Sequence, residues 1–544
     1  MFFALILHTN KKKQQKTDKK MKKIMLLLLV SAIMTGIAAA QGYEIKIKIH
    51  HIPNDTVILG HHFNERLIPD DTVVLDNKCE GVFRGKEKLP GGMYFMFLPS
   101  HNYFDFLIDG SQKFSIENDT TDFLKNMKIT GSLENQIFHD YQVMLGDASK
   151  DYRTLNEDFE KVKGDSVKEA PIREKMKAVS QRVEQAYKDQ ITKYPDQFFS
   201  VFLKSTRDIE VPATITDQND RFYYYKNHYF DNFPLSDARL LRTQYYQNKV
   251  EKYIDNLCMQ MPDSLNKECK WLIDKARGND ELFRFMLVFL FNKYAKNENM
   301  YAENVYVELA DIYIKDAKWD TDSFKTELGK KIAKRKNCLV GNPSKDLLMR
   351  QLPNDTVKIE ALRPAIDKMK EEGVAVEKAK PDFEARRNDV VRILNNLVNN
   401  FGRTDISVHS IPAKYKMVVF WEPDCSHCKE EMPKLFSFYK DTLSTIGCKV
   451  FAIYMNKSVD NLGDLHRHMN KWFDFVKKQK MMATGWYNYF NPFDQYRDNY
   501  DVNSTPTFYL LDDKNEILAK RISFHQMYDL MKFLDEAKEK EKQK

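Results

Sequence analysis

The chain has 544 residues, which is too long for one compact core and predicts two to four domains. Its formal net charge of +7 comes from residues 1–40, which hold eight Lys and one Asp; of the 85 basic and 78 acidic residues, 77 of each remain. That balance gives no support for nucleic acid as a partner. Seven cysteines are few for a secreted chain of this length, so disulfides are not expected to be its scaffold.

Residues 1–40 have the pattern of a secretory signal peptide. Two lysines precede an apolar run from Ile24 to Ile37, and Ala38–Ala40 then offer small residues for cleavage. The run is shorter than the ~20 residues of a membrane span, which argues against an anchor. Met21 is a second candidate for the initiator. We therefore expect an exported chain, periplasmic or elsewhere in the cell envelope, with no membrane span after cleavage.

Residues 41–131 are predicted to form a small antiparallel β domain. Apolar and polar residues alternate from Tyr43 to Ile49, which is typical of a half-buried strand. Turn residues separate five further expected strands: Thr56–Leu59, Thr72–Leu75, Met93–Leu98, Phe104–Ile108 and Lys113–Ile116. The neighbouring pairs His50–His51 and His61–His62 point to opposite faces of a strand, so we favour solvated surface histidines over a metal site.

Residues 132–337 are predicted to be α-helical, with Ser132 as the cap of the first helix. Apolar residues recur three or four positions apart in Ile172–Tyr194, Glu281–Tyr294 and Val305–Ile314. No catalytic constellation stands out in this region. We interpret it as a spacer or partner-binding domain.

Residues 338–544 are predicted to form an α/β domain, in which a mixed central sheet is flanked by helices and a charged helical insertion occupies about 354–404. The order is strand, helix, strand, a long excursion, two strands and a helix. The expected strands are Lys345–Met349, Met417–Trp421, Val450–Tyr454, Thr507–Leu511 and Ile517–Ile522. The helix after Trp421 buries Met432, Leu435, Phe436 and Tyr439, and the last helix starts with a Ser523–Gln526 capping box and buries Met527, Leu530 and Phe533.

Two cysteines at C-x-x-C spacing, Cys425 and Cys428, follow the strand that ends at Trp421. A thiol at a helix start is favoured as a thiolate by free backbone N–H groups and the helix dipole. A second thiol one turn later lies within bridging reach. We therefore expect Cys425 to be the nucleophile and Cys428 the resolving thiol of a disulfide-exchange site that needs no cofactor. His427 would stabilise the thiolate, whereas the charge of Asp424 opposes it.

Zinc is the rival ligand for any C-x-x-C pair. A structural zinc site needs four ligands, and the later candidates are Cys448 and the pair His466 and His468. Such a site usually draws its other two ligands from a second C-x-x-C or H-x-H pair, so zinc is the minor alternative here and we predict no metal.

The segment Val418–Leu435, VVFWEPDCSHCKEEMPKL, resembles the active-site signature of the thioredoxin superfamily and, more closely, its TlpA/ResA-type envelope branch. The resemblance implies that Pro433 bends the active-site helix, that Trp421 lies near the site and that Glu431 manages protons beside the cysteines. It also implies that Thr505-Pro506 contains a cis proline that presents the Thr505 backbone to substrate. The whole chain resembles multidomain exported thioredoxin-like proteins of Bacteroidetes-type bacteria.

Two hypotheses for function follow. In the first, the chain is an enzyme that exchanges disulfides with exported protein or peptide thiols and is served by an upstream redox partner protein. In the second, it is an envelope binding or scaffold protein whose β and helical domains recognise a partner. Peroxide reduction on the same fold is disfavoured because the Pro-x-x-x-Thr-x-x-Cys loop is absent. The direction of electron flow stays open.

Overall fold

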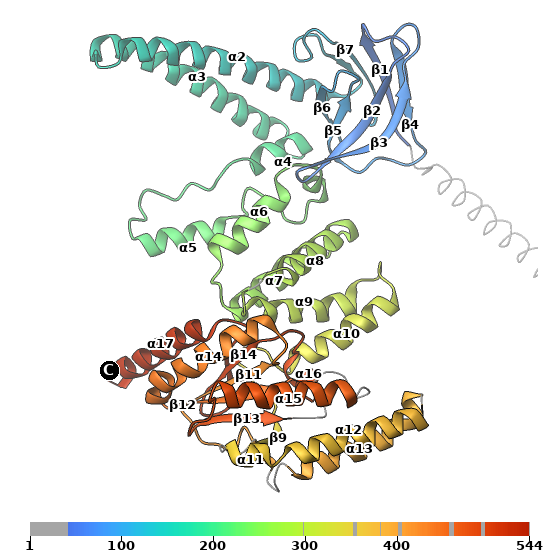
Figure 1. Ribbon diagram of the computed structural model, residues 1–544. Coiled ribbons are helices and arrows are strands. Elements are labelled where there is room, and N and C mark those ends of the chain that lie inside the picture. Colours follow the sequence, from blue (N-terminus) through green and yellow to red (C-terminus); the bar gives the residue numbers. More distant parts are fainter. Residues whose placement is uncertain are drawn as a thin grey trace, which may run out of the picture. The chain divides into compact units, whose positions relative to one another are not determined.

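The computed structural model describes residues 42–297, 299–351, 356–380, 382–400, 405–455, 462–490 and 495–542 (Figure 1). The chain divides into two compact units. The first is Met1–Cys258 with Trp271–Phe283, and the second is Met259–Lys270 with Arg284–Lys544. The predicted signal peptide lies outside the described residues. Within the described ranges, no helix is long and apolar enough to cross a membrane.

The first unit begins with two four-stranded sheets, ordered β4-β1-β7-β8 and β3-β2-β5-β6. Their strands are β1 (Glu44–His50), β2 (Thr56–Phe63), β3 (Arg66–Val74), β4 (Glu80–Arg84), β5 (Gly92–Phe97), β6 (Tyr103–Ile108), β7 (Lys113–Asp119) and β8 (Lys128–Thr130). The predicted alternation in β1 is confirmed, because Ile45, Ile47 and Ile49 are buried. The pairs are antiparallel except for β1 with β7, which is parallel.

The four histidines of the two neighbouring pairs each lie beside a carboxylate. The pairs are His50–Glu117 at 2.7 Å, His51–Asp119 at 3.3 Å, His61–Asp70 at 2.8 Å and His62–Asp105 at 2.8 Å. His62 is only 9% exposed, so the expectation of a solvated surface histidine is wrong for that residue. Its ring packs edge-on against Phe95, and a buried imidazole of this kind needs a hydrogen-bond partner.

Helices follow the β domain. Ser132 caps α2 (Leu133–Val162) as predicted, since its side chain accepts a hydrogen bond from the Asn135 N–H. α2 and α3 (Ser166–Lys193) lie side by side as a hairpin (Figure 1). The helices that follow along the chain are α4 (Phe198–Ser205), α5 (Gln218–His228), η1 (Ala238–Arg242), α6 (Tyr246–Lys252), η2 (Tyr253–Leu257), α7 (Pro262–Ala276) and α8 (Asp280–Ala295). The residues of α7 and α8 are divided between the two units.

The second unit contains α9 (Ala302–Asp316), α10 (Asp322–Lys336) and a seven-stranded sheet ordered β10-β9-β13-β12-β11-β14-β15. The strands are β9 (Leu348–Gln351), β10 (Asp405–Ser407), β11 (Tyr415–Trp421), β12 (Cys448–Tyr454), β13 (Trp486–Phe490), β14 (Thr507–Leu511) and β15 (Ile517–Lys520). β11 is parallel to β12 and antiparallel to β14, so the predicted mixed sheet is confirmed. In sequence order, the first strand of this sheet is β9, which starts at Leu348 and not at the predicted Lys345.

Helices cover both faces of this sheet. One face packs against α12 (Arg363–Ala379), α13 (Phe383–Asn400), α14 (Ser426–Asp441), α15 (Leu462–Lys478) and α17 (Phe524–Lys542). The other packs against α16 (Gln495–Tyr500) and the segment around Cys338. A short helix, α11 (Thr356–Glu360), precedes α12.

Two sequence predictions for the helices of this face can be compared directly with their burial. The predicted apolar face of α14 is confirmed, because Met432, Leu435, Phe436 and Tyr439 are buried. The predicted face of α17 is partly wrong: Met527 is buried, but Phe533 is 66% exposed. Phe533 lies off the face that Phe524, Met527 and Met531 bury, whereas Asp535 further along the helix still bonds to Tyr415 of β11.

Candidate functional site

The motif cysteines follow the carboxyl end of the central strand. β11 ends at Trp421, and α14 begins at Ser426 with Cys425 as its N-cap residue. The Cys428 backbone N–H donates a hydrogen bond to Cys425 Sγ over 3.5 Å. The predicted position of Cys425 at a helix start is confirmed. There the free N–H groups of the first turn stabilise negative charge on sulfur.

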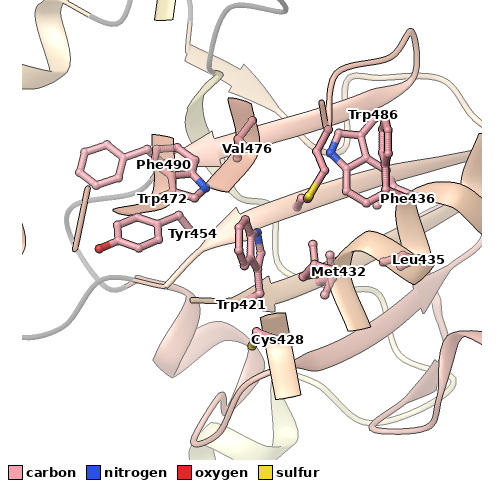
Figure 2. Close-up of a cluster of buried hydrophobic side chains, with 14 of the residues drawn as sticks. Trp421, Cys428, Met432, Leu435, Phe436, Tyr454, Trp472, Val476, Trp486 and Phe490 are labelled. Atoms are coloured by element: carbon pink, nitrogen blue, oxygen red, sulfur yellow. The ribbon is translucent and has the colours of Figure 1, made fainter. Parts of the chain in front are cut away.

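The two thiols, both unbonded, have different surroundings. Cys425 is partly exposed, whereas Cys428 is buried beside Trp421 and Met432 at the edge of the core (Figure 2). Burial pushes the pKa of Cys425 upward, but hydrogen bonds from the Cys428 N–H, Thr505 and the His427 N–H outweigh it and hold that pKa below its ordinary value. Burial raises the pKa of Cys428 to about 12. Cys425 is thus the more acidic and more accessible thiol.

The loop before β14 contacts the nucleophile. The Thr505-Pro506 peptide bond is cis, as the resemblance implies. Cys425 Sγ donates a hydrogen bond to the Thr505 carbonyl oxygen over 3.2 Å. The Thr505 hydroxyl lies 3.5 Å from Glu422 Oε1. Thr505 therefore contacts the first cysteine through its backbone and a carboxylate through its side chain.

The other predicted site residues lie on β11 and α14. Trp421 is buried and packs against Phe475, with ring centroids 5.4 Å apart. His427 is exposed, and Pro433 lies inside α14. The Glu431 side chain is 35% exposed, and its Oε1 pairs with Lys434 Nζ at 3.1 Å. The structure thus brings Cys425, Cys428, Thr505 and Pro506 together, and it places Glu431 on the half-exposed side of α14.

The sequence did not indicate that α15 contacts the loop before Cys425. Asp424 Oδ2 lies 3.1 Å from His468 Nδ1, and Asp424 Oδ1 lies 2.7 Å from Lys471 Nζ. Glu422, next to Trp421, approaches Thr505 as described above. The apolar residues Leu465, Met469, Trp472 and Val476 recur at helical spacing, a pattern that could have predicted α15 with His468 on its buried side.

Among the described residues, no group of three or more His, Cys, Asp or Glu side chains is arranged to hold a metal ion. The residues considered for zinc have other surroundings. Cys448 is buried at the start of β12, and His466 pairs with Asp367 of α12 at 2.8 Å. The Cys425–Cys428 pair, with one partly exposed and one buried thiol, is suited to sulfur chemistry.

Several known proteins and family models are similar to parts of this chain. Residues 361–520 match the AhpC/TSA family, and residues 170–328 match a domain of unknown function, DUF5106. Among solved structures, a thioredoxin-like protein from Bacteroides caccae is similar at 14% identity and a TM-score of 0.39, over 60% of this chain and 98% of that chain. A domain of a possible thiol-disulfide isomerase from Cytophaga hutchinsonii is similar at 22% identity and a TM-score of 0.23, over 38% of this chain and 97% of that one. The curated proteins contain no match.

The family match and the sheet order β13-β12-β11-β14-β15, with Cys425 after the central strand and a cis proline before β14, define a thioredoxin-like fold. This thioredoxin-like part, whose residues 361–520 match the AhpC/TSA family, follows a β-sheet domain and a series of helices.

Proposed function

We propose that the chain is an exported thiol–disulfide oxidoreductase that exchanges disulfides with protein or peptide thiols through Cys425 and Cys428. The observation that carries this proposal is the difference between the two thiols. The pKa of the partly exposed Cys425 is lowered, and burial raises that of Cys428 to about 12. One thiol is suited to attack, and the other is held one helical turn away for resolution.

In the reducing direction, the Cys425 thiolate attacks one sulfur of a substrate disulfide, forms a mixed disulfide and releases the other substrate sulfur as a thiolate. Cys428 then loses its proton and attacks the Cys425 sulfur. The Cys425–Cys428 disulfide forms, and the second substrate sulfur leaves as a thiolate. Two electrons pass to the substrate, and solvent protonates the products. The same steps in reverse oxidise a dithiol, and an upstream redox partner restores the pair.

The surrounding residues have proposed roles in these steps. The Thr505 backbone, beside Pro506 and 3.2 Å from Cys425 Sγ, is suited to hold an extended substrate segment by main-chain hydrogen bonds. His427, Trp421 and Pro433 would tune the potential of the pair, and Glu431 would exchange protons with solvent. Export is supported by the sequence of residues 1–40 alone.

Trapping tests the proposal. In the Cys428→Ser variant, mixed disulfides through Cys425 cannot be resolved, so they should accumulate in the cell envelope and disappear with dithiothreitol. The Cys425→Ser variant should trap none. Both variants should also carry Cys79→Ser, because Cys79 is partly exposed and could form adventitious disulfides. The trapped chain should begin close after Ala40.

The scaffold hypothesis gives the opposite result. If Cys428→Ser traps no partner and the wild-type pair does not reduce or oxidise a disulfide peptide, the β and helical parts carry the function instead. Because residues 361–520 match the AhpC/TSA family, hydrogen peroxide should be tested as a substrate in the same assay. We expect no peroxide turnover above that of the Cys425→Ser variant, since the peroxidatic loop is absent.

A further inference from the structure

The residue directly before the nucleophile is fastened to a helix that lies elsewhere in the sequence. The Asp424 carboxylate accepts a hydrogen bond from Lys471 Nζ at 2.7 Å and faces His468 Nδ1 at 3.1 Å. Both partners come from α15. We call these contacts the Asp424 ion pairs. They join the loop that ends at Cys425 to the helix on the same face of the sheet.

The Asp424 ion pairs differ from an ordinary surface salt bridge, because one partner is buried. His468 is 3% exposed and lies on the apolar side of α15, four residues before Trp472. Trp472 stacks on Tyr454 with ring centroids 4.9 Å apart, and Figure 2 shows both rings next to Trp421 in the same cluster. Burial and the nearby carboxylates of Glu422 and Asp424 raise the pKa of Tyr454. Charges act strongly in such a poorly hydrated region.

The sign of the effect on the nucleophile follows from the charges. An anionic carboxylate beside Cys425 disfavours its thiolate. Burial pushes the pKa of Asp424 upward, but the Lys471 hydrogen bond and the charges of His468, Lys471 and Lys429 outweigh it, so Asp424 is ionised at neutral pH. Lys471, which is hydrogen-bonded to the carboxylate, and His468, 3.1 Å from it, offset the field of that anion at Cys425.

The same helix carries a second His and a second Lys whose carboxylate partners lie on other helices. His466 pairs with Asp367 of α12 at 2.8 Å, and Lys477 pairs with Glu360 of α11 at 2.8 Å. Both sets hold α15 in place, but only the pairs of His468 and Lys471 reach the loop of the nucleophile. His466 and Lys477 thus match His468 and Lys471 in residue type and helix, and they differ in the carboxylates that they reach.

We propose that His468 and Lys471 are positioning residues of the redox site: they hold and neutralise Asp424, which keeps the Cys425 sulfur at the N–H groups of α14 and favours its thiolate. This inference rests on the proposed function, in which Cys425 attacks as a thiolate. It makes α15, and not α14 alone, a determinant of how the pair reacts.

The test measures the acidity of Cys425 in the full-length chain carrying Cys428→Ser and Cys79→Ser, from the pH dependence of iodoacetamide alkylation followed at the Cys425 peptide. Lys471→Gln should raise the Cys425 pKa by roughly half to one pH unit, the size expected for one nearby charge. Lys477→Gln and His466→Gln should change the Cys425 pKa by less than about 0.2 pH units. His468→Gln should raise it in the same direction as Lys471→Gln.

A double-mutant cycle separates this inference from a direct effect of Lys471 on the sulfur. With Asp424→Asn, the change caused by Lys471→Gln should become clearly smaller, because only the direct field of the Lys471 charge at the sulfur remains once the carboxylate that Lys471 holds is gone. An undiminished change in that background would overturn the proposal, as would equal changes for Lys471→Gln and Lys477→Gln. Lys471 is half-exposed, so its variant remains informative if His468→Gln unfolds. Alkylation needs no substrate, so the result is independent of whether trapping succeeds.

Discussion

At the scale of single residues, removal of the Cys428 proton is the demanding step. A pKa of about 12 leaves roughly one thiol in 10⁵ ionised at pH 7. Resolution of a mixed disulfide therefore needs a proton acceptor. The resemblance assigns that task to Glu431, which is half-exposed and paired with Lys434. The Thr505 hydroxyl lies 3.5 Å from Glu422 Oε1, and the Thr505 backbone contacts Cys425, so we expect Thr505 to relay the proton of Cys428 to Glu422.

We expect Glu422→Gln to slow resolution at pH 7 roughly tenfold or more, because an amide cannot accept the proton that Thr505 relays. Glu431→Gln should slow it less than about twofold. The measurement is the single-turnover release of glutathione from a mixed disulfide preformed at Cys425. The difference in resolution rate between Glu422→Gln and the wild type should become smaller as the pH rises toward the Cys428 pKa, since hydroxide then removes the Cys428 proton. A larger loss for Glu431→Gln would return the role to that residue.

At the scale of elements, the helical insertion predicted at about 354–404 is a structural partner of α15. α12 packs directly on α15, and Gly373 lies at the closest approach. A Cβ added there would lie 2.7 Å from Leu462 Cδ1 and 2.8 Å from Leu462 Cβ. The Leu462 Cβ is fixed to the backbone and cannot turn aside. The insertion therefore supports the helix that carries the Asp424 ion pairs.

Gly373→Ala should destabilise the second unit by about 1 kcal/mol. The gain of about 1 kcal/mol in helix propensity is outweighed by overpacking of 1–3 kcal/mol against Leu462. Gly329→Ala on α10 is the matched control, because the nearest atom to its Cβ would be 4.0 Å away. That variant should be neutral or stabilising by up to about 1 kcal/mol. Urea unfolding followed by tryptophan fluorescence measures the change in unfolding free energy for both variants. If both variants were destabilised, or both stabilised, the packing argument would be contradicted.

Periodic apolar patterns in the sequence predicted individual helices and strands well, but they did not predict which elements contact one another. β11, α14 and β14 could be predicted because apolar runs and C-x-x-C spacing are local properties of the sequence. The Asp424 ion pairs could not, since a helical pattern reports which side of α15 is buried and not which loop that side meets. Glu422 was missed for the same reason, because its approach to Thr505 depends on β11 and β14 being neighbours in the sheet.

At the scale of the whole molecule, the two compact units are divided at residues other than 131/132 and 337/338. The three predicted domains are a finer division of the chain, and their borders stay predictions. The second unit includes α9 and α10 with the sheet. A buried charge network explains why. Lys520 of β15 is 2% exposed; it pairs with the buried Glu303 of α9, and its Nζ donates to the Cys338 carbonyl oxygen over 2.7 Å. Arg335 of α10 lies 3.5 Å from the same carboxylate. The thioredoxin-like sheet is thus held to helices that precede it.

Glu303→Gln should lower the free energy of unfolding of the second unit by about 3–5 kcal/mol, because removing the carboxylate leaves Lys520 as an uncompensated buried charge. Glu308→Gln, at an exposed position of the same helix, should change it by less than about 0.5 kcal/mol. Urea unfolding of the full chain measures the loss, and hydrogen exchange of the β15 amides shows whether that strand opens first.

The double variant Glu303→Gln with Lys520→Met distinguishes a charge effect from a packing effect. If the buried ammonium causes the loss, its removal should recover much of the stability, since an apolar side chain of similar length tolerates the dry site. No recovery would mean that the Glu303 carboxylate acts mainly through Arg335 and Arg521, each 3.5 Å away. Either result is consistent with α9 stabilising the thioredoxin-like unit. A negligible loss of unfolding free energy in Glu303→Gln alone would mean that this carboxylate does not link α9 to the sheet. In that case the predicted border at residue 338 would mark the start of an independent redox domain.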